Sequence, residues 1–324
     1  MRTIGAAAIL WCALAGVLQP AYAQEACVPG PGKLGIARTL NVNTANGPHF
    51  GSQYRGSGFL ADGEVVLTFD DGPSRSYTRA ILDALAAQCT KATFFMLGQM
   101  ALADPQLVKE VARQGHTVAT HTWSHANLQA LPQAKAQDEI ELGLSAVQHA
   151  LGKPVAPFFR FPYLRDTPLT LSHLKSRQLA AFGIDIDSRD FETKDASLVY
   201  DRVMRELAAK RKGIVLFHDI HASTARAVPR ILEELRAQGF RVVHVVPKAG
   251  AETLAEYDTL AQEAAERRRV TAAAGPLAKR AITWPSSISP NAHGSVAPPA
   301  SPAPAVHSAS PREDWTADFW RQSQ

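Results

Sequence analysis

The sequence predicts an α/β fold built on a parallel sheet or a barrel, and two observations support this prediction. Between residues 63 and 247, short apolar runs alternate with longer amphipathic stretches, as in repeated strand–helix units. Gly115, Gly152 and Gly239 stand just past predicted helix ends, where a left-handed cap is favoured. About 185 residues of this kind are enough for one domain with a core of its own.

Seven apolar segments have the length and composition of buried strands. They are Val65–Phe69, Ala92–Leu97, Thr117–Thr120, Phe158–Arg160, Ala180–Asp185, Gly213–Phe217 and Arg241–Val246. Six amphipathic segments are predicted to be helices. They are Tyr77–Gln88, Pro105–Gln114, Gln133–Leu151, Thr167–Arg177, Ser197–Arg211 and Val228–Gln238. Since parallel strands place their chemistry at their carboxyl ends, the polar residues that follow each strand are candidates for a shared site.

The N-terminal region has the features of an exported protein. Residues 1–23 contain Arg2, an apolar run and a small-residue cleavage site ending at Ala23, which together are typical of a secretory signal peptide. Residues 24–62 are rich in glycine, proline and polar side chains and predict an N-terminal arm, with one strand-like piece at Gly35–Leu40. We therefore expect a periplasmic or secreted protein with no transmembrane anchor after signal cleavage.

The composition changes after residue 248, where the domain predicted over residues 63–248 ends. Residues 249–270 predict a charged helix, and residues 271–324 predict a disordered tail because alanine, proline and serine cannot bury enough apolar surface. Trp315, Phe319 and Trp320 stand at helical spacing near the end of this tail. They predict either an amphipathic patch that docks on a partner or surface, or a disordered tip.

Charge and cysteine content limit the classes of protein. The net charge is +4, or +3 without Arg2, which gives no reason to expect a nucleic-acid partner. Only Cys27 and Cys89 remain after signal cleavage, and an even pair in an exported protein favours a disulfide bond. The alternative is a buried Cys89 and a free Cys27.

Two adjacent carboxylates, Asp70 and Asp71, end the first strand of the domain, and Gly72-Pro73 turns the chain away. One carboxylate can hold a metal ion while the other stays free as a base. A solvated turn with no catalytic role is the alternative.

His121 and His125 follow the strand Thr117–Thr120, and a helical turn between them would let both imidazoles reach one ion. Together with an aspartate from another strand end they form two histidines and one carboxylate. Three protein ligands with an open position are the set that a catalytic zinc ion uses. Paired surface histidines are the alternative for this segment alone.

Three further strand ends carry polar side chains. Arg160 can orient a carboxylate by a bidentate bond, or it can form a purely stabilising salt bridge. Asp190 lies in a polar segment after the strand Ala180–Asp185. His218 ends an apolar strand, where neighbours can tune its pKa around neutrality for work as a general acid.

Five segments carry a resemblance to a known family. They are TFDDGP at 68–73, HTWSH at 121–125, RFPY at 160–163, DSRDF at 187–191 and LFHD at 216–219. In this order they resemble the polysaccharide deacetylase family, which is also called the NodB-homology domain or carbohydrate esterase family four. The resemblance covers roughly Gly63 to Pro247, and it implies a distorted (β/α)7 barrel.

The resemblance implies roles for the paired acids and histidines. Asp70 matches the catalytic base, and Asp71, His121 and His125 match the ligands of a divalent metal ion. Zn²⁺ is the expected ion, with Co²⁺, Ni²⁺ or Mn²⁺ as alternatives.

The resemblance also implies roles around this centre. Arg160 matches the residue that orients the base, and Asp190 matches a carboxylate that supports this arginine. Tyr163 matches the residue whose backbone N–H helps to hold the oxyanion. Leu216 matches a residue that lines the acetyl pocket, and His218 matches the general acid.

The expected protein is thus an exported hydrolase of carbon–nitrogen bonds that removes N-acetyl groups from a GlcNAc-containing glycan. Peptidoglycan, an exopolysaccharide and chitin-like oligomers all remain open as the substrate. Phe191 stands where the family often has tryptophan, which changes one wall of the acetate pocket. The alternatives are an esterase for O-acetyl groups, as on xylan, and a non-catalytic glycan-binding protein. The presence of both Asp70 and His218 argues against a non-catalytic binding protein, because binding needs neither a base nor an acid.

Overall fold

The computed structural model describes residues 27, 30, 32–54 and 58–273. The predicted signal peptide and most of the predicted C-terminal tail, including its aromatic tip, lie outside these residues. Among the residues described, no helix has the length and apolar character needed to cross a bilayer.

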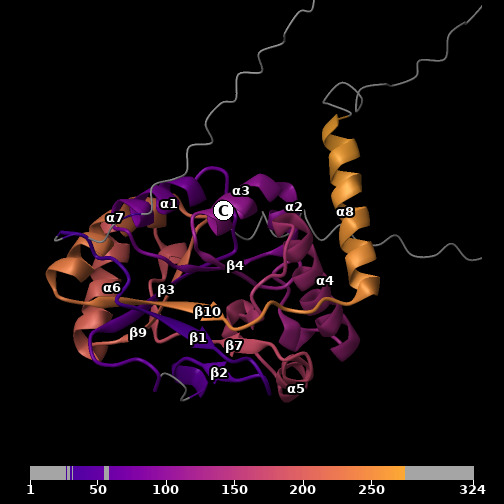
Figure 1. Ribbon diagram of the computed structural model, residues 1–324, viewed down its shortest axis with the longest axis horizontal. Coiled ribbons are helices and arrows are strands. Elements are labelled where there is room, and N and C mark those ends of the chain that lie inside the picture. The colour runs from indigo at the N-terminus through magenta and orange to yellow at the C-terminus, as the bar shows by residue number, and fades with distance from the viewer. Residues whose placement is uncertain (1–26, 28–29, 31, 55–57, 274–324) are drawn as a thin grey trace, which may run out of the picture.

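A mostly parallel sheet forms the centre of the domain, with helices around it (Figure 1). The strands are β1 (Arg38–Val42), β2 (His49–Phe50), β3 (Glu64–Asp70), β4 (Thr93–Met96), β5 (Thr117–Thr120), β6 (Phe158–Phe159), β7 (Ala180–Phe182), β8 (Ile186–Asp187), β9 (Gly213–His218) and β10 (Arg241–Pro247). The helices are α1 (Thr78–Ala87), α2 (Gly98–Ala103), α3 (Pro105–Arg113), α4 (Gln133–Leu151), α5 (Pro168–Ser176), α6 (Ala196–Lys210), α7 (Ala222–Ala237) and α8 (Ala255–Ala273). The α/β fold expected from the sequence is confirmed.

The strand pairings extend the sheet in both directions from β3. β3, β4, β5, β6 and β7 pair in sequence order, each in parallel. β8 begins at Ile186, shortly after β7 ends at Phe182, and it pairs with β9. β9 pairs with β3 along its whole length. The carboxyl ends of these strands therefore meet around one opening, which is where Asp70 and His218 lie at paired positions of β3 and β9.

Two apolar clusters lie on opposite faces of the strands. The larger cluster packs the outer faces of the strands against the helices and includes Val65, Leu67 and Phe94. The smaller cluster includes Val66 and Phe95, the residues that alternate with them. Since successive strand residues point to opposite faces, the smaller cluster fills the interior of the barrel.

The predicted N-terminal arm pairs with the sheet as well. β1 adds to β10, and β2 adds to β7, so the arm contributes two strands rather than the single piece predicted near Gly35–Leu40. A disulfide bond joins Cys27 to Cys89 just after α1, which ties the start of the arm to the domain. The placement of a domain boundary near residue 63 stays a prediction.

Two helices differ from the expectation. α7 begins at Ala222, six residues before the predicted start at Val228, because Ser223 and Thr224 in its first turn donate hydrogen bonds to Asp190. The short α2 was not predicted. The charged helix near the C-terminus is observed as α8, which packs against α4 and α2 and extends past the body of the domain (Figure 1).

Candidate active site

The paired acids of the first strand end have different surroundings. Asp70 is the last residue of β3, whereas Asp71 follows in a left-handed conformation with φ of 74°. The turn that follows is held by hydrogen bonds from Asp71 N–H to Phe95 O (3.2 Å) and from Leu97 N–H to Gly72 O (3.2 Å). A Cβ at Gly72 would lie 2.2 Å from a carboxylate oxygen of Asp219, so the close approach requires glycine.

Asp71, His121 and His125 bring three ligand atoms to one point. The Nε2 atoms of both histidines lie 3.4 Å from Asp71 Oδ1. Tetrahedral zinc ligands at about 2.0–2.1 Å from the ion stand about 3.3–3.4 Å from one another, so this spacing fits the ion. Asp71 Oδ1 is buried and accepts no hydrogen bond within the described part of the chain, which also fits a metal ligand.

The protonation of His121 suits metal binding. Its Nδ1–H donates to the carbonyl oxygen of Arg160 at 2.7 Å, which leaves the Nε2 lone pair directed at Asp71. Burial and the neighbouring His125 lower the pKa of His121 to about 3, so the imidazole is neutral. Burial alone would raise the pKa of Asp71, but the surrounding histidines lower it overall.

The two histidines are not held by the helical turn that the sequence suggested. The segment is a loop in which Thr122 and His125 both have positive φ angles, of 72° and 64°. The Thr122 side chain accepts from the His125 N–H, and Glu139 of α4 accepts from the backbone and the hydroxyl of Ser124. Side chains therefore stabilise a backbone that the sequence alone does not indicate.

Asp70 is held by a buried arginine. Arg160 is fully buried, and its Nη1 donates to Asp70 Oδ1 at 2.7 Å and to Thr68 Oγ1 at 2.8 Å. Its other nitrogens donate to the carbonyl oxygens of Phe182 (3.1 Å) and Gly183 (3.2 Å). Burial raises the pKa of Asp70, Arg160 opposes this, and the result is a pKa of about 6. The carboxylate is thus fixed in place and close to the protonation range of a general base.

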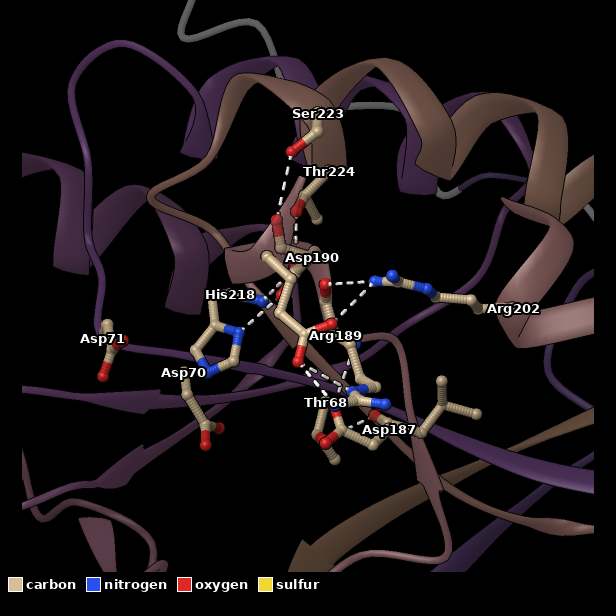
Figure 2. A network of polar contacts seen from close by, with 12 residues as sticks. Thr68, Asp70, Asp71, Asp187, Arg189, Asp190, Arg202, His218, Ser223 and Thr224 are labelled. Carbon is tan, nitrogen blue, oxygen red and sulfur yellow. Dashed lines mark hydrogen bonds and ion pairs between the residues drawn. The ribbon is translucent and has the colours of Figure 1, made fainter. Parts of the chain in front are cut away.

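The sequence interpretation gave Asp190 the wrong partner. Asp190 does not bond Arg160; one of its carboxylate oxygens accepts from His218 Nδ1 at 2.6 Å. The other oxygen accepts from the His218 backbone N–H (2.8 Å) and from the hydroxyl of Thr224 (Figure 2). Burial alone would lower the pKa of His218, but Asp190 raises it to about 10. The imidazole is therefore held protonated, with Nε2 left to face the site.

Two exposed aromatic rings stand at the two sides of this centre. The Tyr163 ring lies 4.6 Å from that of His125, and the Phe191 ring lies 5.7 Å from that of His218. Both residues are more than half exposed, whereas Leu216 is buried. Tyr163 has φ of 58°, which fixes the direction of its backbone at the loop. The oxyanion role of its N–H and the acetyl-pocket role of Leu216 stay predictions.

Asp219 was not singled out from the sequence, although it lies inside the LFHD segment. Its N–H donates to Asp70 O at 3.3 Å, and its buried carboxylate accepts from the Thr78 hydroxyl beneath Gly72. Burial raises the pKa of Asp219 to about 7. Asp219 thus packs under the turn that carries Asp70 and Asp71.

The fold and site together define a barrel hydrolase in which a metal-type triad lies next to a carboxylate held by Arg160 and a histidine held by Asp190. A family model described as "Polysaccharide deacetylase" matches residues 60–182. The chain is 31% identical over 199 residues to a chitooligosaccharide deacetylase from a Bradyrhizobium species, and it covers 89% of that relative. The chain therefore belongs to the polysaccharide deacetylase family.

The chain is also similar to a relative and to a solved structure that are named as peptidoglycan deacetylases. The chain is 32% identical over 184 residues to the peptidoglycan-N-acetylglucosamine deacetylase PgdA of Listeria monocytogenes, but this match spans only 38% of that relative's length and 56% of this chain. A solved structure of the Bdellovibrio bacteriovorus peptidoglycan deacetylase Bd3279 aligns with a TM-score of 0.61 at 34% identity. That alignment covers 68% of this chain and 61% of the other.

Proposed function

We propose that this protein is an exported, metal-dependent hydrolase that removes N-acetyl groups from a GlcNAc-containing glycan. The observation that carries the proposal is the triad of Asp71, His121 and His125 placed beside Asp70 and His218, which lie at paired positions of β3 and β9. Each of the last two has its own buried partner, Arg160 for the carboxylate and Asp190 for the imidazole. Family membership supports the same reaction class.

The protein's own groups account for the proton transfers. A divalent ion held by Asp71, His121 and His125 would supply Lewis acidity toward the acetyl carbonyl and the attacking water. Asp70, oriented by Arg160, takes a proton from that water as its oxygen bonds to the carbonyl carbon. His218 donates its Nε2 proton to the amide nitrogen as the carbon–nitrogen bond breaks. Acetate and a free amine leave.

Export is supported by two features. Residues 1–23 have the pattern of a secretory signal, and a disulfide joins Cys27 to Cys89. Disulfide bonds persist in oxidising compartments, so a periplasmic or secreted location fits the protein. The glycans that the named relatives act on also make this the compartment where a substrate would be met.

Acetate release tests the reaction. Purified protein, stripped with a chelator and reloaded with Zn²⁺, Co²⁺, Ni²⁺ or Mn²⁺, is assayed on peptidoglycan, chitooligosaccharides and O-acetylated xylan. We expect release from N-acetylated glycans only, and only with metal. Release from xylan alone would replace the proposal with an esterase. No release from any substrate by metal-loaded protein would contradict a hydrolytic function.

Matched variants test the division of roles between the two acids. Asp70→Asn should lose turnover but keep about one bound metal ion, whereas Asp71→Asn should lose the metal. Metal analysis of both proteins is the measurement. If Asp70→Asn loses its metal and Asp71→Asn keeps it, the base and the ligand are assigned the wrong way round.

A further inference from the structure

A cavity opens beside the candidate general acid. It has a volume of about 520 Å³ and lies between the end of the η4 turn (Asp190–Glu192) and the start of α7. Phe191 and His221 line it, and their rings lie 5.7 and 5.9 Å from the ring of His218. This volume is within the range of about 300–1,000 Å³ that ligand sites occupy. A group bound here would sit directly next to the residue that protonates the leaving amine.

Positive charge dominates the walls of the cavity. Lys194 and Arg226 both line it and are exposed. Arg226 donates one hydrogen bond to the backbone carbonyl oxygen of Lys194 at 2.8 Å, which holds its guanidinium beside the backbone of that residue. Over the part of the chain that the structure describes, neither cation has a carboxylate within 4.0 Å.

The single acidic side chain among the lining residues is already paired. Glu192 forms ion pairs with Arg189 at 2.6 Å and with Arg202 at 3.3 Å. In Figure 2, Arg189 is labelled just below Asp190 and Arg202 to its right. Glu192 therefore does not neutralise Lys194 or Arg226, and the cavity presents two cations whose counter-charge is not supplied by their neighbours.

We propose that this cavity is the subsite for the sugar next to the one that loses its acetyl group, and that Lys194 and Arg226 select a glycan with a carboxylate on that neighbouring sugar. The proposal rests on the proposed deacetylase function. The planar guanidinium matches a carboxylate by paired hydrogen bonds, and the lysine adds a second positive charge. The exposed ring of Phe191 offers a flat apolar face to the sugar. A neutral chitin-like chain would leave both cations without a partner.

The carboxylate has two chemical sources in glycans. It can be the ring carboxylate of a uronic acid, or it can belong to an acidic ether or peptide group attached to the sugar, as in a muramyl residue. The chemistry of recognition is the same for both, and the substrates of the test separate them.

The experiment compares acidic and neutral substrates on the full, metal-loaded protein. The substrates are a neutral GlcNAc tetrasaccharide, a tetrasaccharide that alternates glucuronic acid with GlcNAc, and a GlcNAc–muramyl-peptide fragment. The variants are Lys194→Gln, Arg226→Gln and the double variant. Arg236→Gln is the matched control, because it removes the same charge from the same helix but lies outside the cavity lining.

We expect wild type to favour at least one acidic substrate in kcat/KM. Each single variant should reduce the ratio of acidic to neutral kcat/KM about two- to five-fold, and the double variant up to about 30-fold, as for exposed ion pairs. The wild-type preference should weaken in about 0.5 M salt because such pairs are screened. Arg236→Gln should match wild type. The acidic substrate that responds identifies the source of the carboxylate.

A binding measurement tests the subsite independently of the deacetylation reaction. Calorimetric titration with the same tetrasaccharides should show tighter binding of an acidic one, and the double variant should lose the difference. If no protein releases acetate but this binding difference is found, the reaction is wrong, and recognition of an acidic glycan by Lys194 and Arg226 stands. If wild type and the double variant show the same acidic-to-neutral ratio in both binding and turnover, the subsite proposal is overturned.

Discussion

Arg160→Lys should destabilise the protein strongly even though it keeps the positive charge. The guanidinium of Arg160 donates hydrogen bonds to four acceptors. Asp70 and Thr68 accept from Nη1, and the carbonyl oxygens of Phe182 and Gly183 accept from Nε and Nη2. A lysine has its three donors on one nitrogen, so it can remain with Asp70 only by leaving the two carbonyl groups.

The size of the destabilisation follows from these hydrogen bonds. Arg160 is fully buried, so no water replaces the lost donors. Each buried acceptor left without a partner costs about 1–3 kcal/mol, so the two carbonyl groups cost about 2–6 kcal/mol together. A domain is stable by only about 5–15 kcal/mol, so this is a large share. Asp70 also loses its fixed orientation, and a misplaced base can cost about 100-fold in turnover.

Urea unfolding followed by circular dichroism measures the effect. The metal-free form is used, because metal binding would add its own stabilisation. Arg75→Lys is the control, since Arg75 bonds Asp104 and the Ala103 carbonyl oxygen on the surface with 74% of its side chain exposed. That variant should lie within about 0.5 kcal/mol of wild type. If Arg160→Lys unfolds at the same urea concentration as wild type, the argument from buried acceptors is refuted.

Three further outcomes are expected. Asp190→Asn should lower the pKa of His218, so the alkaline limb of the pH–rate profile should move to lower pH. At pH 7 kcat should fall about 10²–10⁴-fold, with the metal content unchanged. An alkaline limb that does not move would contradict the pairing of Asp190 with His218. Replacing Cys27 and Cys89 by serine should lower the free energy of urea unfolding by about 4 kcal/mol, because their bond closes a loop of 62 residues, and an equal midpoint would refute this. Truncation after Val270 should keep kcat/KM on a soluble oligosaccharide, and a folded but inactive product would place the tail in the site.

The strands were predictable because their signal is local. Each of the seven predicted apolar runs is a strand of the sheet, since a run buried on both faces has few other uses in an α/β fold. The arm strands were harder, because β1 and β2 are stabilised by β10 and β7, which lie far away in the chain. Nothing in the arm's own residues shows those partners.

The positions of the site residues were predictable, but the pairings among them were not. Asp71, His121 and His125 come together because parallel strands end at the same edge of the sheet. That Asp190 meets His218 rather than Arg160 depends on the path from η4 to α7, where Thr224 supplies the third donor. The order of motifs in the chain does not record which cation a buried carboxylate reaches.

The cost of burying these charges argues for catalysis rather than glycan binding alone. Arg160 and Asp190 are both completely buried, and taking an ion out of water costs several kcal/mol that the pairing only partly returns. Neither side chain reaches the metal-type triad, so holding a metal does not require them. Arg160 fixes the carboxylate of Asp70, and Asp190 keeps the imidazole of His218 protonated, both next to the triad. A hydrolytic reaction needs a fixed base and a charged acid at those places, whereas a binding surface has no use for either.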